Sequence, residues 1–285
     1  FALSRTHHER GIALCDAQRH ATLHTLPGSL SDHAVSFRAM VAWVLWELGY
    51  PDQAMRRGQE ALCMAHALAH PFTLVEALRY RARLHALRRE WQTAQAHAET
   101  QLTLATKHGF ARHVALGVFF RGWALAAQGQ GAEGIAQMRQ SLDASRAMGG
   151  VVGLEVPALA ETYGQVGQVD EGLHLLVEEL LRASTTGGRD RAERHRVHGE
   201  LLLQQALPEA LAAEACFKQA LDVARQQQAT SWELRAAMSL SRLWQQQGKR
   251  AEAYDLLAPV YNWFTEGFGT ADIQEARALL EELGK

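Results

Sequence analysis

The 285-residue chain has few of the residues that build strands, disulfides or sharp breaks in helices. It contains 3 Ile and 15 Val against 48 Ala and 39 Leu, and 6 Pro in all. Because β-branched residues favour strands while Ala and Leu favour helices, this composition predicts an all-α protein. The three cysteines, Cys15, Cys63 and Cys216, lack a CxxC or zinc-ligand spacing. This pattern suits a reducing compartment and indicates a cytoplasmic location.

An excess of positive charge is also missing, since the formal net charge is −2. Sequence-independent binding to nucleic acid needs a cationic excess or a dense basic stripe, so no nucleic-acid partner is expected. No apolar run reaches the roughly 18 residues of a membrane span, and no membrane partner is expected either. The chain opens with Phe1 rather than Met and falls directly into a helical pattern. This opening indicates a fragment of a larger polypeptide.

What the chain does have is an internal repeat, marked by short polar turns between apolar helical stretches. The turns lie at 49–54, 89–94, 129–134, 167–172, 206–212 and 248–253, about 40 residues apart. They predict six helix pairs over 31–70, 71–110, 111–150, 151–188, 189–229 and 230–269. Residues 1–30 are expected to form a helix and loop that end a preceding repeat or cap the array. A last helix over 270–285, with Thr270 as its N-cap, is expected to cap the other end.

Small residues recur at two positions of every repeat. Seven residues before each turn stand Ala42, Ala82, Gly122, Ala160, Gly199 and Ser241, and early in each second helix stand Ala54, Ala94, Gly134, Gly172, Ala213 and Ala253. Two antiparallel helices approach closely only where their crossing point carries little side chain. These positions therefore predict tight pairing of the two helices of each unit.

The pattern of small residues, a turn glycine and a following aromatic, as in Ala213–Leu221, resembles the tetratricopeptide repeat (TPR). The resemblance implies a right-handed α-solenoid of antiparallel helix pairs, although the period here is near 40 residues rather than 34. Segments Trp43–Ala54, Arg121–Gly129, Gly199–Leu203 and Leu256–Phe268 are similar to the C-terminal TPR region of bacterial predicted ATPases. Such proteins carry a STAND-type ATPase module, often behind an adenylate or guanylate cyclase domain.

Motifs for catalysis or cofactor binding are weak. Residues 129–134 match GxGxxG, but a helical stretch precedes them where a dinucleotide site needs a strand, so we interpret them as a turn. No GxxxxGK[ST] loop occurs. The pairs His66/His70 and His195/His198 have ligand-like spacing, but a zinc site needs three or four converging ligands. We therefore expect no catalytic residue, no cofactor, no metal and no enzymatic activity.

The TPR resemblance also implies a concave groove lined by the first helix of each pair. Its partner-facing positions here are Trp43, Trp46, Glu76, Arg79, Arg83, Phe119, Trp123, Glu161, Arg196, Glu200, Arg235 and Arg242. Trp and Arg are the residue types that dominate binding hot spots. The alternative interpretation is that the Trp side chains pack between adjacent first helices and that Arg79 and Arg83 pair with Glu76 on a solvated surface.

Three hypotheses for function follow. The favoured one is a non-catalytic scaffold that binds a peptide or a protein domain in its groove. It would serve as the regulatory or sensor arm of a larger bacterial signalling ATPase or cyclase, with that module in the same polypeptide. The alternative is a small-molecule inducer-sensing domain of a multidomain transcription regulator, which an enclosed polar pocket would favour. The third is an enzyme with a metal on the histidine pairs.

Overall fold

The computed structural model describes residues 1–19, 32–150, 153–182 and 188–285. These residues form fourteen helices and no strand, so the predicted all-α class is confirmed. They fall into two compact units, Phe1–Gly150 and Val151–Lys285, which we call unit 1 and unit 2. The loop expected to follow the helix within residues 1–30 lies outside the described residues.

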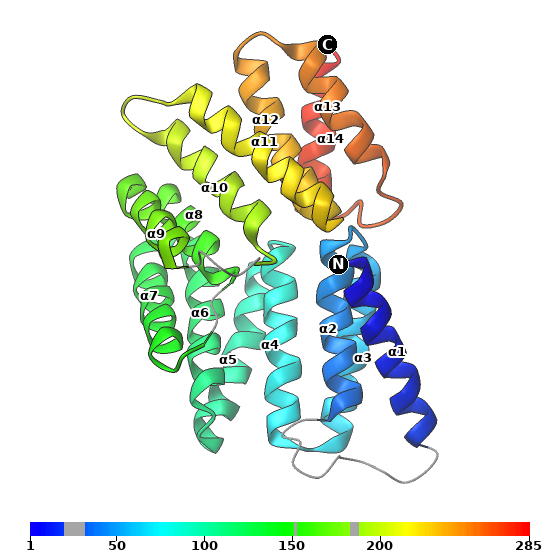
Figure 1. The fold of residues 1–285 in the computed structure, drawn as a ribbon. Helices are drawn as coiled ribbons and strands as arrows, with labels where there is room; N and C mark the ends of the chain where they lie inside the picture. The colour runs from blue at the N-terminus through cyan, green and yellow to red at the C-terminus, as the bar shows by residue number, and fades with distance from the viewer. Residues whose placement is uncertain (20–31, 151–152, 183–187) are drawn as a thin grey trace. The chain divides into compact units, whose positions relative to one another are not determined.

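Seven helices belong to each unit (Figure 1). Unit 1 contains α1 (Ala2–Arg19), α2 (His33–Glu47), α3 (Pro51–Leu68), α4 (Pro71–Leu87), α5 (Trp91–His108), α6 (Ala111–Ala127) and α7 (Gly131–Ala147). Unit 2 contains α8 (Glu155–Gln165), α9 (Val169–Arg182), α10 (Arg191–Gln204), α11 (Ala210–Gln227), α12 (Thr230–Gln246), α13 (Arg250–Asn262) and α14 (Ala271–Leu283). The repeat boundaries expected from the sequence stay a prediction.

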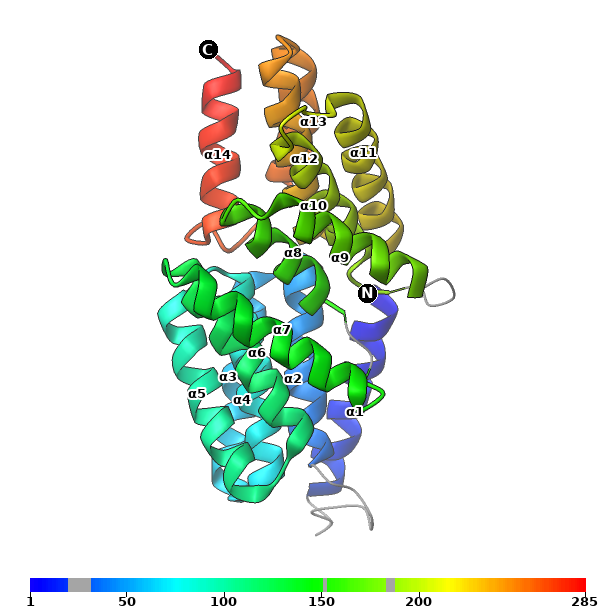
Figure 2. The ribbon, with the colours of Figure 1, turned by 90° about the vertical axis from the view of Figure 1, so that its left-hand side faces the viewer.

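Within each unit the first helices of the pairs form one continuous layer. In unit 1, α2 contacts α4 and α4 contacts α6, whereas the described residues of α3, α5 and α7 make no such contacts with one another. In unit 2, α8, α10, α12 and α14 follow each other in the same way, and Figure 2 shows the red α14 beside α12 and α13. We call the layer of first helices the inner layer.

The inner layer is also the more buried one. Twelve of the 17 residues of α4 are buried, against four of the 18 residues of α5. A first helix is enclosed by its own partner and by the first helices on either side, so apolar residues cover most of its circumference. Within a unit, a second helix contacts its own partner and the next first helix, and a narrow stripe of mostly small residues is enough for both contacts.

The expected small residues lie at the points where paired helices cross. All twelve are buried. A Cβ added to Gly134 would lie 2.5 Å from the carbonyl oxygen of Gly122 and 2.6 Å from the Cβ of Ala126. In the last pair the hydroxyl of Ser241 donates to the carbonyl oxygen of Ala253 over 3.0 Å. The helices thus touch backbone to backbone, as the sequence predicts.

Five of the six turns between paired helices contain a residue in the left-handed backbone conformation, the turn between α10 and α11 being the exception. Gly129 has φ 92°, and Arg89, at the equivalent position of the preceding repeat, has φ 60°. The GxGxxG match at 129–134 begins in the turn between α6 and α7 and continues into the first turn of α7, which starts at Gly131. At the start of α14, Thr270 is the N-cap residue, but its hydroxyl donates to the carbonyl oxygen of Gly267 over 2.8 Å rather than capping the helix.

The contact between Gly122 and Gly134 predicts a strong steric effect of a single methyl group. We expect Gly134→Ala to lower the free energy of unfolding by about 1–3 kcal/mol, because the added atom overlaps the backbone of α6. Urea unfolding followed by circular dichroism measures this change. Gly269→Ala is the control, since its Cβ would have no neighbour within 4 Å, and it should change stability by less than about 0.5 kcal/mol. Equal effects of the two substitutions would contradict the account.

Candidate functional site

Three of the predicted groove aromatics belong to the core of unit 1. Phe119 has no exposed surface, and Trp46 and Trp123 are 3% and 7% exposed. The Phe119 ring lies 6.2 Å from that of Trp123, and the Trp123 ring lies 5.6 Å from that of Trp91 on α5. Buried rings cannot meet a partner, so these three residues are corrected from partner-binding to packing residues. The spacing identified the helix, but the neighbouring helices determine which of its faces is covered.

Trp43 takes part in a row on α2 and α4 in which two aromatic rings lie side by side with an arginine at each end. The guanidinium carbon of Arg83 lies 3.8 Å from the ring centroid of Trp43, and that of Arg79 lies 4.0 Å from the ring centroid of Tyr80. The rings of Trp43 and Tyr80 are 6.4 Å apart. Each cation–π contact contributes roughly 0.5–2 kcal/mol. We call Trp43, Arg83, Tyr80 and Arg79 the arginine–aromatic row; its contacts hold the two arginines in place.

A pocket of about 480 Å³ adjoins this row at the beginning of α4 and α6. It is lined by Phe72, Glu76, Arg79, Phe110, Ala111, Arg112, His113 and Leu116. The three residues from α4 are spaced four and three positions apart, so they share one face of that helix. The others belong to the N-cap and first turns of α6. Because α4 contacts α6, both sets meet at one place.

Charges in the pocket are partly compensated. Glu76 accepts a hydrogen bond from the Ser36 hydroxyl over 3.2 Å and pairs with Arg79 over 3.5 Å. Arg112 is exposed and forms no ion pair with any residue that the structure describes. With two arginines against one carboxylate, the lining has one excess positive charge.

His113 is the buried titratable group of the pocket. Burial lowers its pKa to about 4; the positive charges of Arg79 and Arg112 also lower it, while Glu76 acts in the opposite direction. Its ring lies edge-on to Phe72, with centroids 4.9 Å apart. His113 is therefore neutral near pH 7, where it can donate one hydrogen bond and accept another.

Sequence reasoning found Glu76 and Arg79 but missed the rest of the pocket. Phe72 and Arg112 each lie four residues before the first groove position of their repeat. The groove positions taken from the TPR resemblance therefore begin one helical turn too late in each first helix. The sequence did carry a signal for the pocket, because Phe72 and Arg112 occupy equivalent positions in consecutive repeats. Phe110 and His113 lie within two residues of Arg112 in the sequence.

In unit 2 the predicted groove residues pair with one another across the inner layer. Arg196 on α10 contacts Glu161 on α8 over 2.6 Å and Glu193 on its own helix over 2.7 Å. The Glu200 carboxylate lies 3.8 Å from Arg196 and accepts a hydrogen bond from Ser239 on α12. These contacts connect α8, α10 and α12.

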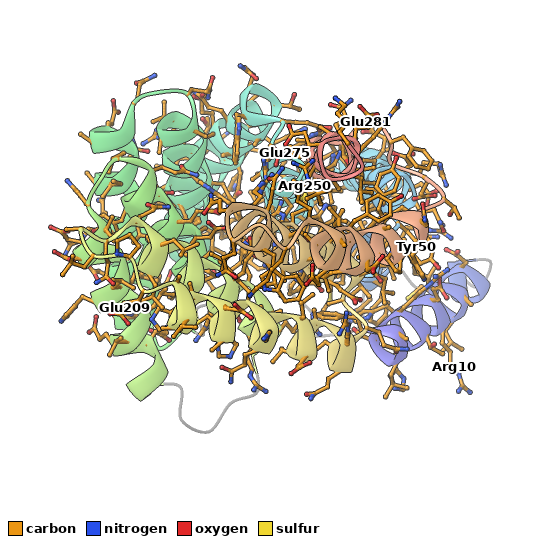
Figure 3. The ribbon with its side chains drawn as sticks, turned by 90° about the horizontal axis from the view of Figure 1, so that it is seen from above. Arg10, Tyr50, Glu209, Arg250, Glu275 and Glu281 are labelled. Atoms are coloured by element: carbon orange, nitrogen blue, oxygen red, sulfur yellow. The ribbon has the colours of Figure 1, made fainter. Side chains whose placement is uncertain are left out.

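The same network continues to α14. Arg235 on α12 contacts Glu193 over 3.3 Å and Asp272 over 2.7 Å. Arg242 contacts Glu275, which is labelled on α14 in Figure 3, over 3.2 Å. Although burial opposes the charge, Asp272 and Glu193 raise the pKa of Arg235, and Arg196 and Arg235 lower that of Glu193. The charged forms of Arg235 and Glu193 are thus favoured, and the ion pairs hold neighbouring first helices together.

The histidine pairs do not converge with other ligands. His198 lies 3.7 Å from the Cys216 sulfur, and burial lowers the pKa of His198 and raises that of Cys216. Among the residues that the structure describes, no three His, Cys, Asp or Glu side chains are placed to hold a metal ion. Within the same described ranges, no helix has both the length and the hydropathy that a membrane crossing requires.

No protein-family model matches the chain, and no curated protein does. Solved structures with a similar fold include NprR in complex with its cognate peptide NprX, with a TM-score of 0.62 and 14% identity over 98% of this chain and 81% of that one. The apo quorum sensor NprR from B. thuringiensis has a TM-score of 0.58 and 14% identity over 98% and 79%. A Rap protein complexed with competence and sporulation factor has a TM-score of 0.58 and 15% identity over 96% and 72%. The fold is thus a TPR-like helical solenoid, which confirms the predicted fold class.

The ion-pair network in unit 2 predicts that removing one of its buried side chains strongly lowers the stability of the protein. We expect Arg235→Leu to lower the free energy of unfolding by about 3–5 kcal/mol, because Glu193 and Asp272 lose a buried counter-charge. The control is Arg277→Leu, which removes an exposed pair with Glu281 and should cost less than about 1 kcal/mol. Thermal or urea unfolding compares the two variants. A small effect of Arg235→Leu would contradict a stabilising role of the network.

The lowered pKa of His113 predicts a dependence of stability on pH. An unfolded histidine titrates near 6.5, so between about pH 6.5 and 4 the unfolded chain binds a proton that folded His113 does not. The contribution of neutral His113 is complete above pH 6.5 and is lost as the pH falls toward 4. Urea unfolding at pH 7 and pH 5 should show a smaller loss for His113→Gln than for the unchanged protein. Equal losses would contradict this assignment.

Proposed function

We propose that the chain is a non-catalytic scaffold that binds a peptide on the inner layer of unit 1. The observation that carries the proposal is the continuity of the arginine–aromatic row with the pocket at the start of α4 and α6. Aromatic rings provide rigid apolar area, and arginines provide planar donors for peptide carbonyl and carboxylate groups. Of the predicted groove residues, Trp43, Glu76 and Arg79 are proposed to contact the partner, whereas Arg83 is buried against the Trp43 ring and is proposed to hold that ring in place.

Unit 2 is a weaker candidate for the binding surface. Its inner-layer arginines and carboxylates are already paired across the helices, and Arg196 and Arg235 are buried. A peptide would have to break those pairs to use them. Glu161, Arg196, Glu200, Arg235 and Arg242 are therefore proposed as residues that hold the first helices of unit 2 together.

The solved structures of similar fold support a peptide partner, since NprR is in complex with its cognate peptide and Rap with competence and sporulation factor. The resemblance of the sequence to the C-terminal region of bacterial predicted ATPases supports a finer proposal. The scaffold would be the sensor arm of a larger signalling ATPase or cyclase in the cytoplasm, and peptide binding would regulate that module.

One observation favours a second function, the sensing of a small molecule. A pocket of about 480 Å³ falls in the size range of small-ligand sites. It has charged and aromatic groups, as an inducer site would need. The two functions differ in whether the ligand extends from the pocket along the arginine–aromatic row.

Selection from a random peptide library on the purified protein tests the proposal. We expect enriched peptides to bind with one site per chain in isothermal titration calorimetry. Arg79→Ala should weaken their binding about tenfold, the range of a moderate hot spot. The control is Arg139→Ala, which removes an exposed arginine from α7 in the outer layer and should leave the affinity unchanged.

Two results would contradict the proposal. If no peptide is enriched, the peptide function fails and the small-molecule function becomes the better account. If the selected peptides bind Arg79→Ala as tightly as the unchanged protein, the binding surface lies elsewhere.

A further inference from the structure

We propose that the pocket at the start of α4 and α6 is a subsite for one carboxylate group joined to an aromatic or aliphatic group. This inference rests on the proposed function, and it states which chemical group of the ligand the pocket takes. Its residues are Phe72, Glu76, Arg79, Phe110, Ala111, Arg112, His113 and Leu116.

The apolar part of the ligand is indicated by the rings. Phe72 and Phe110 are half-buried and meet edge to face, with centroids 5.1 Å apart. The His113 ring packs edge-on against Phe72, and Leu116 adds aliphatic surface. These rings hold one another in place and still reach solvent, so they offer a preformed apolar surface. A flat apolar group can cover it with little loss of side-chain conformational entropy.

The charged part of the ligand is indicated by the arginines. The pocket has one excess positive charge, because Glu76 compensates only one of Arg79 and Arg112. Glu76 is itself shared between Ser36 and Arg79, so it is held on the α4 side of the pocket. Arg112 is left to pair with a ligand anion, and a guanidinium binds a carboxylate with two parallel hydrogen bonds.

The position of α6 adds to this preference. Ala111, Arg112 and His113 are the first three residues of a 17-residue helix, and all three line the pocket. The positive end of the helix dipole therefore borders the space in which the anion would lie. Together with Arg112, it favours negative charge at the α6 side, while the rings favour apolar groups beside it.

Other ligand classes fit less well. A cation would meet Arg79 and Arg112, and a neutral apolar group would cover Arg112 without compensating its charge. A ligand with several phosphates needs more than one excess positive charge in its site. A monoanion with an apolar body satisfies both halves of the pocket. The carboxylate can be the C-terminus of a peptide, an acidic side chain next to an apolar residue, or a free aromatic acid.

Three probes separate these sources. N-acetyl-phenylalanine carries a ring and a terminal carboxylate, N-acetyl-phenylalaninamide carries the same ring without the charge, and N-acetyl-aspartyl-phenylalaninamide carries the carboxylate on a side chain. Their dissociation constants are measured by calorimetry, and the His113 ring is followed by NMR with His113→Gln to assign its signal. We expect one or both of the acidic probes to bind at least about tenfold more tightly than the neutral amide.

Variants of Arg112 provide the second readout. We expect Arg112→Ala to weaken binding of the acidic probes about fivefold or more, and Arg112→Lys to weaken it less, because lysine keeps the charge but loses the two parallel hydrogen bonds. Arg139→Ala on α7 is the matched control and should have no effect. A bound acid should also raise the pKa of His113, because a nearby anion stabilises the imidazolium ion.

Equal binding of the acidic and neutral probes, no binding of any probe, or unchanged affinity of Arg112→Ala would overturn the subsite. Failure of the subsite is distinguishable from failure of the proposed function. If library peptides bind through Arg79 but Arg112→Ala has no effect, the scaffold stands and the subsite is wrong. If the acidic probes bind through Arg112 but no library peptide is enriched, the subsite stands, its ligand is a free acid, and the peptide function is wrong.

Discussion

The rest of the structure depends on the close approach of the two helices in each pair. Gly122 and Gly134 leave room for nothing larger than a hydrogen atom, and Ser241 reaches the backbone of Ala253 directly. Backbones this close bury the small residues, and the second helix contacts its partner and the next first helix through a narrow stripe while its remaining face stays exposed. The first helix is then free to pack against the next first helix, which produces the inner layer.

The two units join their first helices by different chemistry. In unit 1, aromatic rings of the inner layer pack into the core, and Arg79 and Arg83 lie on the faces of Tyr80 and Trp43. In unit 2, buried arginines and carboxylates connect α8, α10, α12 and α14. In unit 2 the paired charges satisfy each other deep in the layer, whereas in unit 1 the arginine–aromatic row leads into a pocket whose lining carries one more positive than negative charge. This difference is the reason that binding is assigned to unit 1.

The sequence predicts the helices, their turns and their crossing points well, because these depend on local periodicity and residue size. It predicts the inner-layer positions of Arg196 and Arg235 but not their pairing, which depends on where α14 places Asp272. It does not predict that Phe119 is buried, because neighbouring helices decide which face is covered. The pocket was missed for a related reason: it combines residues of two repeats, and Phe110 belongs to the turn between them.

A solved structure of the protein with a selected peptide tests the central claim most directly. We predict that the peptide lies on the inner layer of unit 1, along Trp43 and Arg79, with a carboxylate at hydrogen-bonding distance, about 2.7–2.9 Å, from the guanidinium of Arg112. A peptide that lies on the outer helices, or that displaces the ion pairs of unit 2 and leaves the pocket empty, would contradict the account.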